Sequence, residues 1–157
     1  MKVFTTVAAA ALAAATSAGA ESVAPGGVAF DEYGAVAASL SGVAGDPENG
    51  AKMMNKGKGN CIACHLTPSL AHLPFHGEVG PVLEFPADVW SEAELRGIVT
   101  DAKRTFDGSM MPSFYKEGGF VRPGDKFSGK AGAEPLPTIL TAQEIEDVVA
   151  YLLTLKE

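Results

Sequence analysis

Cysteine is nearly absent from this chain: only Cys61 and Cys64, two of 157 residues, carry a thiol. Basic residues are also few, with 12 against 19 acidic residues and a formal net charge of −7. This acidic balance argues against nucleic acid and anionic membrane surfaces as binding partners. Beyond residue 20 no apolar run is long enough to cross a bilayer, so we expect no membrane span.

The first twenty residues have the pattern of an export signal. Lys2 precedes an apolar run at residues 7–15, and Ala18-Gly19-Ala20 is a small-x-small cleavage site. The alternative, a buried N-terminal helix, is less suitable because a run of small residues packs poorly. We therefore expect cleavage after Ala20 and export to the periplasm. The mature chain would have 157 − 20 = 137 residues, which suits one domain, and 11 − 19 = −8 net charges.

The two cysteines lie three positions apart and are followed directly by His65. A disulfide between them would close a very short loop, an arrangement found mostly in redox-active thiol proteins. Such sites follow a strand, and the lysine- and glycine-rich residues 56–60 do not form one. A structural zinc site would usually add a second C-x-x-C or a histidine pair, and the sequence has neither.

Covalent attachment of one haem c uses every residue of the C-x-x-C-H motif. The thiols of Cys61 and Cys64 would bond to the two vinyl groups on one edge of the porphyrin, and His65 would bind the iron. Export would bring the chain to the compartment where such attachment occurs. We therefore expect a single covalently bound haem c with His65 as an axial iron ligand.

The second axial ligand is expected to be a methionine, because a thioether favours Fe(II). Met110 and Met111 lie in an irregular segment after Gly108. We favour Met111 because Pro112 imposes extended geometry on the residue before it, which can aim a side chain inward. The other two histidines, 7 and 11 residues beyond His65, are restricted by chain reach to the same side of the iron and are expected at the surface or against the haem propionates.

Three helices are predicted from capping signals and apolar spacing. Asp46 caps a helix over residues 47–56, which leads directly to the haem motif. The segments after Ser91 and Thr141 each have glutamate at capping-box spacing, followed by apolar residues at helical intervals.

The stretches between these helices, residues 66–89 and 112–140, are too rich in glycine and proline for regular structure. No segment has the alternation typical of a strand. Long loops in a compact domain are usually functional, and contact with a haem edge would give these loops a role. The predicted fold class is all-α, with a few helices wrapped around one haem.

In order along residues 45–156, the CIACH motif, the HGEVGP segment, the Met-Pro pair and the closing EIEDVVAYLLTLK resemble a class I cytochrome c. The resemblance implies the class I cytochrome c fold. It places Gly50 where the first helix crosses the last, close to Tyr151. It also implies that the Pro81 carbonyl accepts the imidazole proton of His65.

Three departures from the usual pattern of class I cytochromes c indicate a particular group of these proteins. A long arm precedes the domain, Gly57-Lys58-Gly59 separates the first helix from the haem motif, and a long excursion follows the Met-Pro pair. Together with the segments SLSGVAGDPENG and MMPSFYKEGGFVRPGD, these features resemble the SoxX family, the mono-haem subunits of the SoxAX complex of bacterial thiosulfate oxidation. The expected organisation is a signal peptide at 1–20, an N-terminal arm at 21–44 and a cytochrome c domain at 45–157.

The SoxX resemblance implies an electron-transfer role. A SoxA-type cytochrome subunit would form a heterodimer with this chain and catalyse the oxidative coupling of thiosulfate to a cysteine of a SoxYZ-type carrier protein, an L-cysteine S-thiosulfotransferase reaction. This chain would pass the two released electrons, one at a time, to a soluble cytochrome c. Its own iron would bind no substrate, because His65 and Met111 would fill both axial positions.

Two other functions stay open. A free-standing monomeric cytochrome c shuttle would elute without a partner. An enzyme with its methionine displaced would have a high-spin iron that binds ligands readily.

Two groups of residues outside the haem motif each allow two interpretations. Apolar residues of the arm and loops are predicted to cover the partner, or to fold back on their own domain: Val23, Val28, Phe30, Phe114, Tyr115 and Phe120. Basic residues that stand out in this acidic protein could steer acceptors or thiosulfate, or form a solvated face: Lys103, Arg104, Lys116, Arg122 and Lys126.

Overall fold

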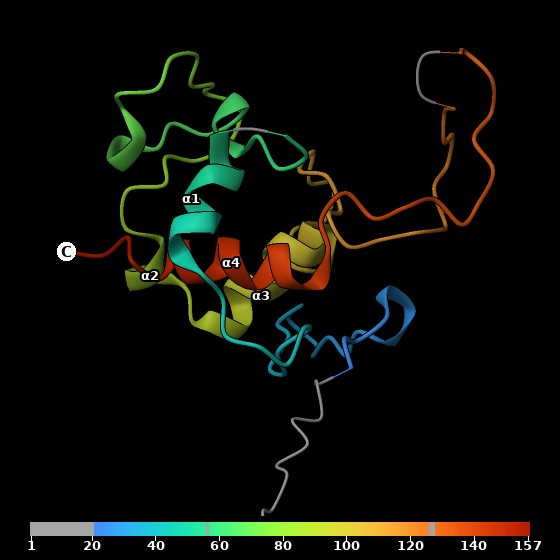
Figure 1. The fold of residues 1–157 in the computed structure, drawn as a ribbon, viewed down its shortest axis with the longest axis horizontal. Coiled ribbons are helices and arrows are strands. Elements are labelled where there is room, and N and C mark those ends of the chain that lie inside the picture. The colour runs from blue at the N-terminus through green and yellow to red at the C-terminus, as the bar shows by residue number, and fades with distance from the viewer. Residues whose placement is uncertain (1–20, 56, 126–127) are drawn as a thin grey trace, which may run out of the picture.

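The structure is a computed structural model that describes residues 21–55, 57–125 and 128–157. The α-helices in this part of the chain are α1 (Pro47–Asn55), α2 (Pro86–Val89), α3 (Glu92–Asp101) and α4 (Ala142–Leu152) (Figure 1). Single turns of 3-10 helix are η1 (Pro25–Gly27), η2 (Cys61–Ala63), η3 (Pro68–Leu70) and η4 (Ala102–Arg104). These residues contain no strand, only an isolated bridge between Gly124 and Ala131. The expected export signal, Lys56 and Lys126 lie outside the described residues.

The long helices begin where their capping signals predict. The backbone N–H groups of Glu48 and Asn49 donate to Asp46 Oδ1 at 2.9 and 3.3 Å, which caps α1. Complete capping boxes start α3 at Ser91 and α4 at Thr141. In the first of these boxes, hydrogen bonds from Ser91 hold the pKa of Glu94 below its usual range.

The prediction of no regular structure over residues 66–89 is wrong in two places, because η3 and α2 form within it. Each of these short turns begins with a proline, Pro68 or Pro86. The fixed φ angle of proline suits the first helical position, and its missing N–H would have no partner there. Proline therefore starts helical turns in this stretch as well as ending them.

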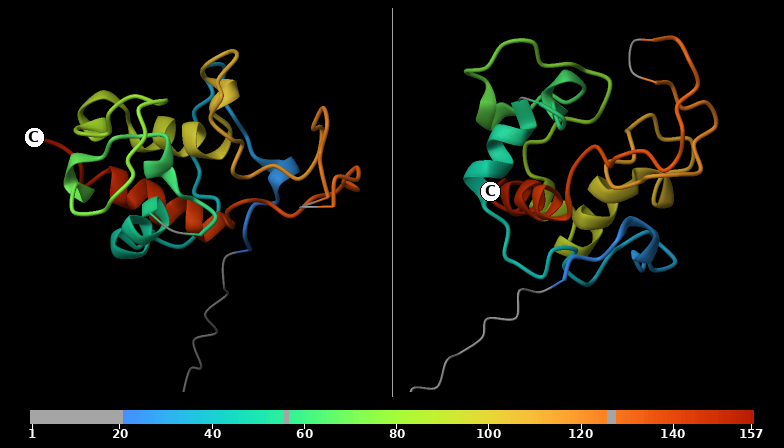
Figure 2. Two further views of the ribbon diagram at one scale, coloured as in Figure 1. Left: turned by 90° about the horizontal axis from the view of Figure 1, so that it is seen from above. Right: turned by 45° about the vertical axis from the view of Figure 1, so that its right-hand side comes forward.

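Helices α1 and α4 cross in close contact at the centre of the fold (Figures 1 and 2). A Cβ atom on Gly50 would lie only 2.0 Å from the Asp147 carbonyl oxygen and 2.8 Å from Tyr151 Cβ. The predicted role of Gly50 is therefore confirmed. The crossing also buries the side chains of Met54, Ile145 and Val148.

The N-terminal arm packs against its own domain. Val36 and Leu40 are buried in the core, and Val23, Val28 and Phe30 pack against it. From the loop after the Met-Pro pair, Phe114 and Tyr115 are likewise buried in the core. Phe114 and Tyr115 therefore fold back on their own domain, as one of the two alternatives predicted. Val23, Val28, Phe30 and Phe120 are only partly buried, and their role in covering a partner stays a prediction.

A buried ion pair joins the arm to α3 and α4. Arg96 on α3 is 3% exposed and Glu146 on α4 is 4% exposed, and Arg96 Nε lies 2.9 Å from Glu146 Oε1. Arg96 also donates to the carbonyl oxygen of Val36 at 2.9 Å, and the Leu40 N–H donates to Glu146 Oε1 at 2.7 Å. A further contact pairs Arg96 with Glu92. Each partner of the pair thus also binds the arm backbone.

We expect Arg96→Met to lower the free energy of unfolding by about 3 to 5 kcal/mol, because it leaves Glu146 buried without its counter-ion. Urea denaturation of the holoprotein followed by circular dichroism measures the change. The control is Lys58→Met, which removes the exposed pair with Glu144 at 3.2 Å and is expected to cost about 1 kcal/mol or less. Equal losses in the two variants would contradict the role assigned to Arg96.

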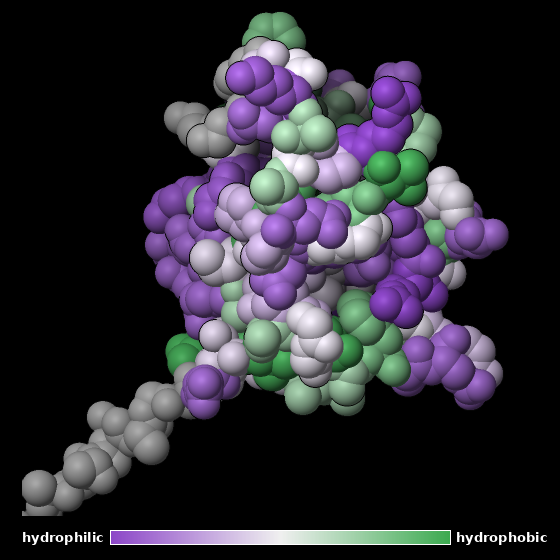
Figure 3. Space-filling view, turned by 90° about the vertical axis from the view of Figure 1, so that its right-hand side faces the viewer, coloured by the Kyte–Doolittle hydropathy of each residue, from purple (hydrophilic) through white to green (hydrophobic). Residues whose placement is uncertain are grey.

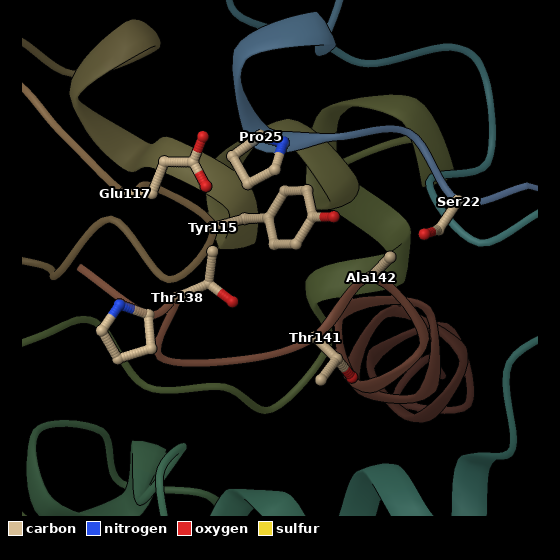
Figure 4. A pocket seen from close by; sticks show the side chains of 8 residues that line it. Ser22, Pro25, Tyr115, Glu117, Thr138, Thr141 and Ala142 are labelled. Carbon is tan, nitrogen blue, oxygen red and sulfur yellow. The ribbon is translucent and has the colours of Figure 1, made fainter. Parts of the chain in front are cut away.

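Residues 116–125 and 128–138 form an excursion that projects away from the helices in every ribbon view (Figures 1 and 2). At its base a pocket is lined by Ser22, Pro25, Tyr115, Glu117, Pro137, Thr138, Thr141 and Ala142 (Figure 4). Tyr115 Oη donates to the Val23 carbonyl oxygen at 2.7 Å, and burial, with a smaller contribution from Glu117, raises the pKa of Tyr115. In the described part of the chain no helix is long and apolar enough to cross a membrane.

Candidate haem site

The C-x-x-C-H motif follows α1 after a tight reversal of the chain. Asn60 has φ 45°, in the left-handed region that asparagine tolerates, and its N–H donates to the Met53 carbonyl oxygen at 3.0 Å. A Cβ atom on Gly59 would lie 2.4 Å from the same oxygen. The insertion before the motif therefore folds back on the end of α1, and η2 places the first cysteine directly beside that helix.

The state of the thiols favours haem attachment over a redox-active disulfide. Cys61 and Cys64 are both free, and burial raises the pKa of the Cys61 thiol to about 11. Redox-active C-x-x-C sites instead have a lowered thiol pKa. Across the described residues no three His, Cys, Asp or Glu side chains converge to hold a metal ion.

His65 is oriented for binding a metal through one nitrogen. Its Nδ1 lies 2.7 Å from the Pro81 carbonyl oxygen. Because a carbonyl oxygen can only accept, Nδ1 carries the proton and Nε2 keeps its lone pair for a ligand bond. The hydrogen bond expected between Pro81 and His65 is therefore confirmed.

Gly80 leaves space for the imidazole ring of His65. A Cβ atom at Gly80 would lie 2.3 Å from His65 Cε1, and the Gly80 N–H donates to the Cys64 carbonyl oxygen at 2.8 Å. The glycine thus holds the second half of the loop against the motif without displacing the ring. Two free thiols, an imidazole with a free Nε2 and this glycine cradle together fit a haem attached at the motif.

The segment around His76 closes the loop over the motif. The Thr67 N–H donates to His76 Nδ1 at 3.1 Å, so the proton is on Nε2, which donates to the Leu70 carbonyl oxygen at 3.1 Å. His76 therefore bridges the loop internally, which differs from the surface or propionate-contacting role expected for it. The other histidine of the loop, His72, is exposed as expected.

The two methionines differ sharply in their surroundings. Met111 is half-buried and packs against the core, whereas Met110 is 84% exposed. The backbone of Met111 is held from two directions: Lys103 Nζ donates to its carbonyl oxygen at 2.5 Å, and its N–H donates to Ser109 Oγ at 3.3 Å. Met111 as the second axial ligand stays a prediction.

Sequence reasoning missed the positioning role of Lys103 and of His76. Lys103 was expected to steer acceptors or to be solvated; it is exposed, and it also anchors the Met111 segment to η4. Of the remaining basic residues, Arg104 lies over the ring of Phe30 at 5.2 Å and Lys116 over that of Phe120 at 5.1 Å. The contact of Arg104 with Phe30 joins residues 74 positions apart, so no local pattern marks it.

Residues 47–156 match the family model of cytochrome c. The chain belongs to the cytochrome c family. Its all-α fold and its single covalently bound haem c follow from that membership, as predicted. No curated protein matches the chain in sequence.

Among solved structures, a chain in the crystal structure of SoxXA from P. pantotrophus has 57% sequence identity with this cytochrome. The match has a TM-score of 0.83 and covers 87% of this chain and 99% of that chain. The predicted resemblance to the SoxX family is thereby confirmed, and this cytochrome c is a haem electron-transfer protein of the SoxX type.

Proposed function

We propose that this chain is the electron-transfer subunit of a periplasmic complex that oxidatively couples thiosulfate to a cysteine of a carrier protein. The observation that carries this proposal is the 57% identity to a chain of SoxXA over 99% of that chain. The matched 87% of 157 residues is about 137 residues, which is the length of the segment 21–157. That length supports an organisation with a removed signal at 1–20, an arm at 21–44 and a cytochrome c domain at 45–157.

Cys61 and Cys64 hold the haem covalently in this proposal, and His65 and Met111 are the axial iron ligands. When bound, the haem supplies one-electron chemistry. Pro81 fixes the tautomer and direction of His65, and Lys103 fixes the backbone beside Met111. With both axial positions taken by protein side chains, no position is left for a substrate.

The proposed partners follow from the SoxX assignment. A SoxA-type cytochrome subunit forms the heterodimer and carries the catalytic site, a SoxYZ-type protein carries the sulfur substrate, and a soluble cytochrome c accepts the electrons. The subunit described here takes electrons from the partner one at a time. In this proposal the catalytic residues belong to the partner subunit, and this chain has none.

Affinity purification of the tagged chain from periplasm of cells grown on thiosulfate tests this function. Recovery of a second haem protein in equal amount is expected, together with thiosulfate-dependent reduction of the haem when the carrier protein is added. Recovery of the chain alone, eluting as a monomer, would contradict the complex and favour a free-standing shuttle. A high-spin spectrum that changes on adding sulfur compounds would favour an enzyme with an open iron.

We expect Gly80→Ala to disturb the His65 bond to the iron, because the new methyl group would overlap the imidazole ring. The optical and electron paramagnetic resonance spectra should change from fully low-spin to a mixture with a large high-spin fraction. Gly26→Ala is the matched control, since a Cβ atom there meets nothing within 4 Å. An unchanged low-spin spectrum in Gly80→Ala would contradict the role assigned to Gly80 beside His65.

A further inference from the structure

Phe75 combines two features that rarely occur together. Its φ angle is +68°, in the left-handed region that disfavours bulky side chains, and it is 90% exposed. The phenyl ring therefore gains almost nothing from packing, while its Cβ strains the backbone. A turn that needed only this backbone shape would be served better by glycine.

The backbone on the C-terminal side of Phe75 is held in place by hydrogen bonds. His76 is fixed by its hydrogen bonds to Thr67 and Leu70, and the Gly77 N–H donates to the Ile62 carbonyl oxygen at 2.8 Å. Strain that the surroundings impose on an exposed residue points to a role outside the fold.

The same hydrogen bonds also place Phe75 next to the haem-attachment motif. A Cβ atom on Gly77 would lie 2.1 Å from the Ala63 carbonyl oxygen, so the segment at 75–77 rests directly on the C-x-x-C turn. A protein that docks on Phe75 therefore sits beside the covalent attachment of the haem.

Between Lys58 and Arg96 in the sequence, acidic residues occur without lysine or arginine. Residues 59–95 contain five acidic residues and no lysine or arginine. Glu78, three positions after Phe75, is exposed. An aromatic anchor with an acidic rim is complementary to a partner surface that has an apolar centre and a basic rim.

We propose that Phe75 and Glu78 form the docking surface for the soluble haem protein that receives the electron, and that this acceptor presents a basic rim. The inference rests on the proposed function and deepens it. One exposed aromatic with a charged rim suits the small interface of a transient electron-transfer encounter rather than that of a permanent subunit. The excursion and the arm lie on the other side of the molecule (Figure 1). The face toward the excursion shows hydrophobic and hydrophilic residues interspersed (Figure 3).

The decisive variant is Phe75→Gly in the reduced holoprotein. It relieves the backbone strain, so the urea midpoint should rise, while the loss of the anchor should slow electron transfer to a basic soluble cytochrome c about fivefold. Stopped-flow spectroscopy measures the second-order rate constant. Oxidation by ferricyanide, a small ion that needs no aromatic anchor, should be unchanged. Tyr33→Ala, which removes a 72% exposed aromatic of the arm, is the matched control.

Reversing the charge of Glu78 tests the docking surface independently of Phe75. Glu78→Lys should slow the reaction with the basic cytochrome at low ionic strength, and the difference should shrink as salt is added. Glu32→Lys on the arm makes the same change in net charge and should leave the rate nearly unaffected. Equal effects of the two reversals would show that only net charge matters and would overturn the docking surface.

Failure of the inference and failure of the proposed function give different results. A full rate in Phe75→Gly, a lowered urea midpoint, or loss of the permanent haem partner from that variant would each overturn the docking role of Phe75. Absence of any electron transfer from the unmodified protein to soluble cytochromes, with ferricyanide oxidation intact, would instead overturn the proposed electron path.

Discussion

Replacing Cys61 and Cys64 together by alanine is expected to abolish covalent haem attachment completely. Both thiols are free, and they are the chain's only two cysteines, so no other side chain can form the thioethers. The denatured variant should be colourless after acid extraction and should have the mass of its bare amino acids. Mass spectrometry and the pyridine haemochrome spectrum of the purified chain measure both properties.

Single replacements separate the contributions of the two cysteines. Cys61→Ala and Cys64→Ala should each keep at most one thioether, and the pyridine haemochrome band should shift accordingly. Ser69→Ala, a change on η3 in the same loop, is the control and should keep the full haem content. Haem that stays bound to the denatured double variant would rule out the assigned attachment and with it the electron-transfer function.

Met111→Ala is expected to remove the near-infrared absorption band of the oxidised protein that reports a bond between thioether sulfur and iron. The reduction potential should fall as well, because a thioether ligand favours Fe(II). Loss of the band should be complete, since Met110 is 84% exposed and carries no contact that would bring it to the iron. Optical spectroscopy and redox titration of the holoprotein measure the two effects.

The matched control is Met110→Ala, which should keep both the band and the potential. Lys103→Met provides a second comparison, because it removes the contact that holds the Met111 carbonyl and leaves the sulfur in place. A weakened band with an intact methionine would support positioning by Lys103. Loss of the band in Met110→Ala alone would show that the ligand is the other methionine.

Features set by neighbouring residues could be predicted from the sequence. The helix starts at Asp46, Ser91 and Thr141 depend on hydrogen bonds spanning two or three residues, so their signals are local. The C-x-x-C-H motif is equally local, and it predicted the haem together with His65 as its first axial ligand. The preference for Met111 over Met110 depends on the proline that follows it, which is also a local signal.

Features that depend on distant residues could not be predicted in this way. Apolar residues of the arm were predicted either to cover a partner or to fold back on their own domain, and the sequence could not decide between the two. The Leu40 N–H binds Glu146, 106 positions away in the sequence. Nothing near Arg96 in the sequence indicates that it would be buried with that carboxylate. In the same way, Lys103 reaches Met111 only because η4 and the methionine segment lie side by side.

The sequence by itself determined the class of protein, the cofactor and the residues proposed to hold it, because covalent attachment requires thiols and an imidazole at fixed spacing. Only the tertiary structure decided where the arm packs, how Gly80 and Lys103 support the segments of His65 and Met111, and why Phe75 is displayed beside the motif. These outcomes depend on close approaches between segments far apart in the chain. Such approaches are set by the packing of the whole domain, and no local pattern of residues records them.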